Sequence, residues 1–223
     1  GQPLSLWHDP QARTLFFFLL WTGVLMGAWL TVSRDIDFAD GLRLAVFNIV
    51  SVVTTTGFVT EDYGEWGPLA AASFFMLMFV GGCTGSTAGS IKIYRYQVLR
   101  ILIDAHLKVL ARSNRIVGLS YHGHPLRDDV SSSVLAFVSV FFGTIAVFTL
   151  LLTAMDIDLL TALSASTPAI TNVGPGLGPI VGPAGNFANL PDAAKWVLCV
   201  AMLMGRLELF TVLVLVQPNF WRG

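Results

Sequence analysis

Charge is scarce in this sequence. Only 12% of its 223 residues are charged, whereas 54% are hydrophobic. No charged residue lies between Thr14 and Val32, a stretch of 19 residues, or between Val130 and Met155, a stretch of 26. Because about 20 apolar residues cross a bilayer as a helix, we expect spanning helices over 14–33 and 130–155. The shortage of charge therefore excludes an ordinary soluble domain.

Groups for catalysis or cofactor binding are also missing. Cys83 and Cys199 fall in apolar segments without metal-ligand spacing, which predicts buried, inert thiols. His122 and His124 have no further ligands nearby, so a solvated loop is favoured over a metal site. A phosphate-binding loop is disfavoured because Lys92 does not follow a glycine at the required spacing. The sequence indicates no enzyme, no organic cofactor and no nucleic-acid partner.

The few charges are unevenly placed. The loops on one side carry nine acidic residues and three basic ones: Asp35, Asp37, Asp40, Glu61, Asp62, Glu65, Asp156, Asp158 and Asp192 against Arg34, Arg43 and Lys195. Seven of the thirteen basic residues lie between the two halves: Lys92, Arg95, Arg100, Lys108, Arg112, Arg115 and Arg127. The positive-inside rule makes that region cytoplasmic. An acidic outer mouth would concentrate cations, although ordinary solvated loop charge explains it equally well.

One pattern occurs twice. Asp35-Ile36-Asp37 follows the first predicted spanning helix, and Asp156-Ile157-Asp158 follows the second. A short apolar segment comes next in each half, 39–53 and 159–170, too short to cross a bilayer. Such segments are permitted at membrane depth when protein buries them or when they line water. We therefore expect two re-entrant pore helices, whose C-terminal dipoles would favour a cation.

A glycine segment follows each of these short helices. A glycine preceded by small hydroxyl or amide residues allows several carbonyls to point one way, as in a site that replaces the water around a cation. We predict two selectivity-filter loops, which would make the chain part of a cation conduction unit. The first comprises Thr54, Thr55, Thr56, Gly57 and Phe58, and the second comprises Thr171, Asn172, Val173, Gly174 and Pro175.

The helix that returns after the first glycine segment, predicted over 67–110, is interrupted. Its apolar run from Pro68 to Val80 reaches only about 20 Å, less than the core thickness of a bilayer. Four glycines in the next ten residues weaken a helix, so we expect a mobile intramembrane gate. The alternative is a small-residue face for helix packing, built on three of the glycines. The run comprises Gly81, Gly82, Cys83, Thr84, Gly85, Ser86, Thr87, Ala88, Gly89 and Ser90.

Arg206 lies near the middle of the other returning helix, predicted over 192–217. An arginine at the centre of a membrane costs about 2.5–3.5 kcal/mol on insertion scales, so it should face the protein interior and have partners. Glu208 would lie about 200° around the same helix and is a poor partner. Backbone carbonyls of residues 81–90 are the better candidates. Arg206 would then be a fixed gate charge that holds the pore shut.

Together these motifs resemble the bacterial Trk/Ktr/HKT potassium transporter superfamily, and specifically its Trk-type pore subunit, over nearly the whole chain. The resemblance implies an all-α membrane protein in which four helix, pore-loop, helix repeats surround one pore. Residues 1–110 would be the third repeat, 111–129 a cytoplasmic basic linker, and 130–223 the fourth repeat. It also implies potassium ions at the filter carbonyls, a multi-pass homodimer in the bacterial inner membrane, and a cytosolic nucleotide-binding regulatory ring on the basic loops.

Two repeats are present where a closed filter needs four, so this chain alone is not expected to conduct. The start at Gly1 favours a fragment lacking the N-terminal half over an assembly of two copies. With no Gly-Tyr-Gly triplet, we expect weaker discrimination against sodium than in dedicated potassium channels. The competing function is a non-transporting membrane scaffold with packed re-entrant helices. The basic stretch from Arg95 to Leu110 would bind either a cytosolic regulator or membrane lipid.

Overall fold

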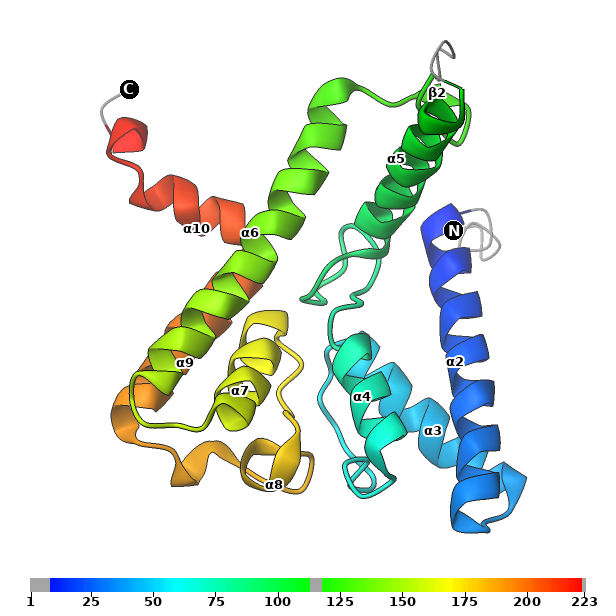
Figure 1. Cartoon of the computed structure of the whole chain (residues 1–223), viewed down its shortest axis with the longest axis vertical. Helices are drawn as coiled ribbons and strands as arrows, with labels where there is room; N and C mark the ends of the chain where they lie inside the picture. Colours follow the sequence, from blue (N-terminus) through cyan, green and yellow to red (C-terminus); the bar gives the residue numbers. More distant parts are fainter. Residues whose placement is uncertain (1–8, 113–117, 222–223) are drawn as a thin grey trace, which may run out of the picture.

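The computed structural model describes residues 9–112 and 118–221, and it is almost entirely helical. Figure 1 shows two lobes that meet where irregular segments lie. The first lobe contains α2 (Pro10–Arg34), α3 (Phe38–Val53), α4 (Pro68–Leu77) and α5 (Ile93–Ala111). The second contains α6 (Asp128–Thr153), α7 (Leu159–Thr171), α8 (Gly178–Val181), α9 (Asp192–Arg206) and α10 (Leu209–Val216), with 3-10 turns at Phe187–Asn189 and Pro218–Trp221. The all-α fold expected from the sequence is confirmed.

The membrane-crossing helices are recognisable by length and composition. Among the described residues, α2 and the span Asp129–Thr153 within α6 are long and apolar enough to cross a membrane, and α9 with α10 makes a third if that bent pair is one span. Large apolar side chains on these helices point outward, with Trp21 63% exposed, Leu150 67% and Trp196 75%. Such exposure is expected where lipid, rather than water, surrounds the protein.

The repeated Asp-Ile-Asp pattern has the same structural role in both lobes. Its first aspartate has a left-handed backbone, with φ of 52° at Asp35 and 62° at Asp156. Its last aspartate caps the helix that follows, because the carboxylates of Asp37 and Asp158 accept a backbone N–H of the first turn at 3.0 and 2.9 Å. Hydrogen bonds from Thr161 hold the pKa of Asp158 below its usual value. The pattern therefore turns the chain sharply and starts α3 and α7.

Close backbone packing joins α2 to α3. A Cβ atom placed on Gly27 would lie 2.9 Å from Cα of Leu42, and one on Gly23 would lie 2.7 Å from Cγ2 of Val46. Small residues one helical turn apart allow two helix backbones to approach this closely. The resulting van der Waals contacts stabilise helix pairs in lipid, where the hydrophobic effect does not drive helices together. Sequence reasoning passed over this pair, although its Gly-xxx-Gly spacing is visible in the sequence.

The two lobes interlock through exchanged apolar residues. Val173, 2% exposed, and Leu177 lie beyond α7 but pack against the core of the first lobe. In the opposite direction, Ile91, 1% exposed, and Phe79 belong to the first lobe but pack with the core of the second. Val173 lies within the irregular segment 171–175, and Phe79 and Ile91 flank the irregular segment 81–90, so the apolar contacts hold these two segments against each other.

The single helix predicted over 192–217 is wrong. α9 ends at Arg206 and α10 begins at Leu209, with an angle of 107° between them. Glu208, at the turn, has φ of 56°, which interrupts the helical hydrogen-bond pattern. The carboxylate of Glu208 forms an ion pair with Nζ of Lys92 in the other lobe, at 3.1 Å. Both returning helices are therefore broken.

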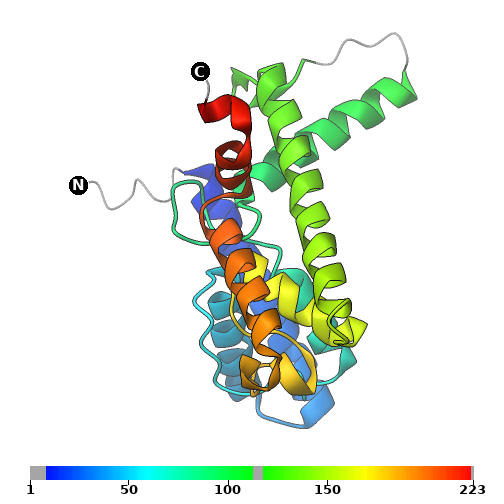
Figure 2. The same ribbon diagram turned by 90° about the vertical axis from the view of Figure 1, so that its left-hand side faces the viewer.

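The interruption of the first returning helix is longer than expected. α4 ends at Leu77, three residues before the predicted limit, and α5 begins only at Ile93. The strand-like pairing of Val80 with Ile91 explains the early end, because it takes the backbone groups that a helix would use. Figure 2 shows α5 leaning away from the rest of the bundle.

The linker 111–129 contains a feature that the sequence did not indicate. Two short strands, β1 (Ser120–Tyr121) and β2 (His124–Pro125), pair in an antiparallel hairpin. The hydroxyl of Tyr121 donates to Oε1 of Gln97 at 2.7 Å, which docks the hairpin on α5. Arg115, counted above with the basic residues of this region, lies outside the described residues.

Candidate functional site

The two glycine segments, 54–58 and 171–175, lie against each other where the lobes meet. Gly57 packs so closely on the carbonyl of Val173 that a Cβ atom there would overlap its oxygen. In both segments a positive φ recurs at the second residue and again at the glycine: 57° at Thr55, 79° at Gly57, 59° at Asn172 and 101° at Gly174. The two segments therefore share a left-handed backbone conformation at the same two positions.

Each segment is hydrogen-bonded to the last turn of the helix before it, α3 or α7. In the first, the carbonyl of Ser51 accepts the N–H groups of Thr56 at 2.9 Å and Gly57 at 3.3 Å. In the second, the carbonyl of Pro168 accepts the N–H of Val173 at 3.1 Å. The negative ends of both helix dipoles therefore meet the glycine segments, and a cation is the ligand that such an end favours.

The glycine-rich segment 81–90 forms a closed loop between α4 and α5. Three backbone hydrogen bonds join its two ends: Gly81 N–H to the carbonyl of Ile91 at 2.9 Å, Ile91 N–H to Phe79 at 3.1 Å, and Ile93 N–H to Gly82 at 3.1 Å. The alternative of a small-residue face on one helix is wrong, because no helix forms between Leu77 and Ile93. The segment is a break, as the four glycines in ten residues indicated.

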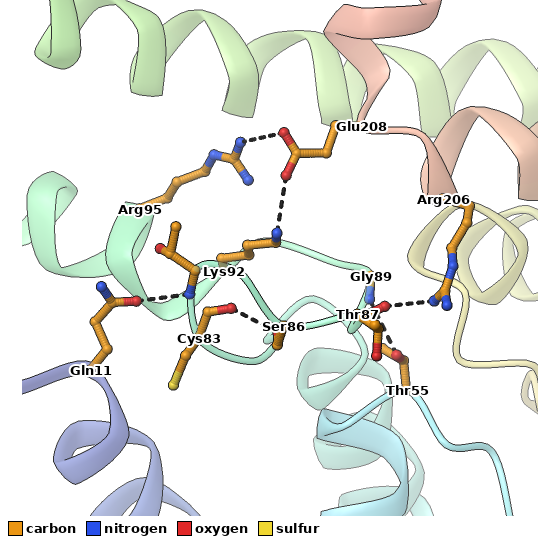
Figure 3. A network of polar contacts seen from close by, with 11 residues as sticks. Gln11, Thr55, Cys83, Ser86, Thr87, Gly89, Lys92, Arg95, Arg206 and Glu208 are labelled. Carbon is orange, nitrogen blue, oxygen red and sulfur yellow. Dashed lines mark hydrogen bonds and ion pairs between the residues drawn. The ribbon is translucent and has the colours of Figure 1, made fainter. Parts of the chain in front are cut away.

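Three elements hold this loop from different directions (Figure 3). From α9, Nη1 of Arg206 donates to the carbonyl of Thr87 at 2.6 Å. From the first glycine segment, Oγ1 of Thr55 accepts the N–H of Gly89 at 3.2 Å. From α2, Oε1 of Gln11 accepts the N–H of Thr84 at 2.8 Å. The contact expected between Arg206 and a carbonyl of the break is therefore present.

The loop also lies directly against the second glycine segment. Gly89 approaches the carbonyl of Thr171 so closely that a Cβ atom would overlap the oxygen, so the position requires glycine. The hydroxyl of Ser90, 8% exposed, donates to the carbonyl of Met78 at 2.5 Å and lies 3.4 Å from that of Thr171. The loop therefore contacts both glycine segments.

A charged cluster that sequence reasoning missed lies beside the loop. Nζ of Lys92 is 3.1 Å and Nη2 of Arg95 is 3.7 Å from the carboxylate of Glu208, and both basic side chains are mostly buried, at 15% and 17% exposed. The Arg95 guanidinium also lies 3.6 Å from the centre of the Phe137 ring, a cation–π contact. Lys92 and Arg95 thus contact the second lobe through Glu208 and Phe137.

The remaining sequence candidates lie apart from this site. In residues 9–112 and 118–221, no three His, Cys, Asp or Glu side chains gather in a way that could hold a metal ion. His122 and His124 belong to the β1–β2 hairpin. The expectation of two buried thiols is wrong, because Cys83 is only half-buried and Cys199 is exposed on α9. Neither the hairpin nor the thiols join the glycine segments.

Comparison with known proteins identifies what this arrangement is similar to. The TrkH family model, described as a cation transport protein, matches residues 2–222. The Trk system potassium uptake protein TrkI of Halomonas elongata is 48% identical over 222 residues, which are 100% of this chain and 45% of that protein. The TrkH of the same organism is 36% identical, covering 96% of this chain and 44% of the relative.

A solved structure gives the same result. The crystal structure of the potassium transporter TrkH from Vibrio parahaemolyticus superposes with a TM-score of 0.90 at 34% identity. The match covers 98% of this chain and 46% of that one. The chain therefore spans about half the length of the proteins it matches.

Proposed function

Because this chain belongs to the TrkH family of cation transport proteins, we propose that it forms half of a pore for potassium uptake. The observation that carries the proposal is the meeting of Gly57 with the carbonyl of Val173, which brings two glycine segments together above one glycine-rich loop. Relatives named as potassium uptake proteins support potassium as the transported ion.

Each part of the site receives a role in this proposal. Residues 54–58 and 171–175 are two of the filter loops, and their backbone carbonyls replace water around potassium. Residues 81–90 are an intramembrane gate below the filter. Arg206 is the gate charge, because its hydrogen bond to Thr87 fixes the loop and its positive charge repels an approaching cation.

The other half of the pore comes from elsewhere in the assembly. Residues 1–110 and 130–223 would act as the third and fourth repeats, completed by an N-terminal half of the same transporter. The exposed face of the first glycine segment supports this, since Phe58 is 70% exposed beside a hollow of about 520 Å³ lined by Val46, Phe47 and Val50. A homodimer in the bacterial inner membrane, with a cytosolic nucleotide-binding ring on the α5 side, completes the proposal.

The test is rubidium uptake in cells that lack their own potassium uptake systems and express the complete gene. Gly57→Ser places a side chain against the Val173 carbonyl at a residue with positive φ. We therefore expect rubidium uptake to fall or the pore to admit sodium. Gly143→Ala is the matched control, because a Cβ atom there meets nothing within 4 Å. Unchanged uptake by an equally abundant Gly57→Ser protein would contradict a filter role for Gly57. Wild-type uptake no higher than in cells without the gene would favour a non-transporting scaffold.

A further inference from the structure

Each glycine segment is fastened a second time, at its far end, by a polar side chain of its own pore helix. Thr60 lies three residues after Gly57, and Leu177 lies three residues after Gly174. Nδ2 of Asn48 donates to Oγ1 of Thr60 at 2.8 Å, while Oδ1 of Asn48 accepts the Thr60 N–H at 3.3 Å. The two lobes repeat this fastening with different chemistry.

In the second lobe the fastening residue is Ser164. Its hydroxyl donates to the carbonyl of Leu177 at 2.6 Å and accepts the N–H of the same residue at 2.5 Å. A hydroxyl can donate once and accept at the same time, so one side chain satisfies both backbone groups of Leu177. Asn48 and Ser164 thus each make a two-point contact with the third residue after a filter glycine.

Both fastening residues are buried and held in place. Asn48 is 0% exposed and also donates to the carbonyl of Leu44 at 2.9 Å, so both hydrogens of its amide are used. Ser164 is 4% exposed. A buried polar group that loses its partner is destabilised, so these side chains favour the one geometry in which their hydrogen bonds are made.

A proline in α7 makes the second contact possible. Pro168 has no N–H, so the carbonyl of Ser164, four residues earlier, lacks its helical donor. Gly176 packs against this carbonyl, and a Cβ atom on it would lie 2.5 Å from the oxygen. The proline therefore leaves the Ser164 carbonyl without a helical partner, and the chain returning through Gly176 packs there. The Ser164 hydroxyl that binds Leu177 belongs to the same residue.

We propose that Asn48 and Ser164 are positioning residues that set the selectivity of the pore between potassium and sodium. The proposal rests on the filter role proposed above for residues 54–58 and 171–175. Each filter stretch, 54–60 or 171–177, is seven residues long and is tied at its start to the end of the pore helix and at its end to Asn48 or Ser164. Carbonyls held at both ends cannot rotate freely to fit a smaller ion.

The experiment compares rubidium and sodium tracer uptake by the complete transporter in cells without their own uptake systems. Asn48→Leu and Ser164→Ala remove the two fastenings. We expect each to lower the ratio of rubidium to sodium uptake by about five-fold, the equivalent of one hydrogen bond of about 1 kcal/mol. The positioning role predicts this change in ratio at equal protein abundance, not merely a lower rate.

Matched variants separate positioning from stability. Ser166→Ala is the control, because its hydroxyl is equally buried in α7 but pairs with Thr149 at 2.7 Å, away from the glycine segment. It should lower the unfolding temperature and leave the ratio unchanged. Thr60→Ser keeps both bonds to Asn48 and should retain the wild-type ratio, whereas Thr60→Val removes only the hydroxyl bond and should lower it.

The outcomes are distinct. If Asn48→Leu or Ser164→Ala fails to accumulate, the comparison of Thr60→Val with Thr60→Ser decides the question at the same contact. The positioning role is overturned if Thr60→Val and every fastening variant that accumulates keep the wild-type ratio of rubidium to sodium uptake. If Gly57→Ser changes uptake in the same experiment, the pore assignment still stands. An unchanged Gly57→Ser protein would instead overturn the pore assignment itself.

Discussion

The guanidinium of Arg206 donates to the backbone carbonyl of Thr87 at 2.6 Å, which joins the end of α9 to the loop between α4 and α5. A charged donor to a carbonyl is one of the stronger hydrogen bonds available to a protein. Because Arg206 belongs to the second lobe and Thr87 to the first, this bond resists any movement of the loop that does not also move α9.

Neutralising Arg206 should therefore open the proposed gate. We expect Arg206→Ala to raise rubidium leak through the complete transporter several-fold, since both the bond to Thr87 and the positive charge are removed. Lys195→Ala is the control, because Lys195 lies at the other end of α9 and pairs with Asp192, which is 91% exposed. Tracer leak measured at matched abundance checks this, and an Arg206→Ala protein as tight as wild type would refute the gate charge.

The Lys92–Glu208 pair should stabilise the fold. Lys92 is mostly buried, so removing Glu208 leaves a charge without its partner, and we expect Glu208→Ala to lower the free energy of unfolding by about 1–3 kcal/mol, between surface and buried values. A double-mutant cycle with Lys92→Met should show that the two losses are not additive. Thermal unfolding in detergent measures both.

The control for that cycle is the exposed pair Lys195–Asp192, 3.0 Å apart, with Asp192 91% exposed. Lys195→Met should cost about 1 kcal/mol or less. The ion pair contributes no more than a surface pair if the losses of unfolding free energy in Lys92→Met and Glu208→Ala are additive and each is as small as in this control.

Gly89→Ala should displace the glycine-rich loop from the second glycine segment. Its Cβ atom would overlap the carbonyl oxygen of Thr171, which is backbone and cannot move aside cheaply. We expect raised rubidium leak together with a lower unfolding temperature. Gly85→Ala in the same loop meets no atom within 4 Å, but its φ of 83° adds strain of about 1 kcal/mol. Equal leak in the two variants would mean that contact with Thr171 is irrelevant to gating.

Gly27→Ala should separate α2 from α3. The new methyl group would press on Cα of Leu42, and overpacking of this kind costs about 1–3 kcal/mol. Gly143→Ala in α6 meets no neighbour and should be neutral or slightly stabilising, because alanine favours a helix by about 1 kcal/mol over glycine. Unfolding temperatures of the two variants, compared with wild type, check the expected contrast.

Much of this architecture follows from short-range features of the sequence. The apolar runs around Thr14–Val32 and Val130–Met155 are long enough to cross a membrane in any context, because hydropathy and length are properties of the segment itself. The paired aspartates predict the starts of α3 and α7, because an N-cap acts within its own first turn. The positive φ values at Gly57 and Gly174 likewise occur where glycine permits them.

The tertiary structure decided what depends on distant partners. The run from Asp192 to Gln217 is apolar enough to be one helix, but it breaks where Glu208 pairs with Lys92 and where Gly205 packs closely on the carbonyl of Ile170. Lys92 and Arg95 resemble loop charges until the fold places them beside Glu208. Hydropathy and capping are local, whereas ion pairs and close backbone contacts exist only once the two lobes have met.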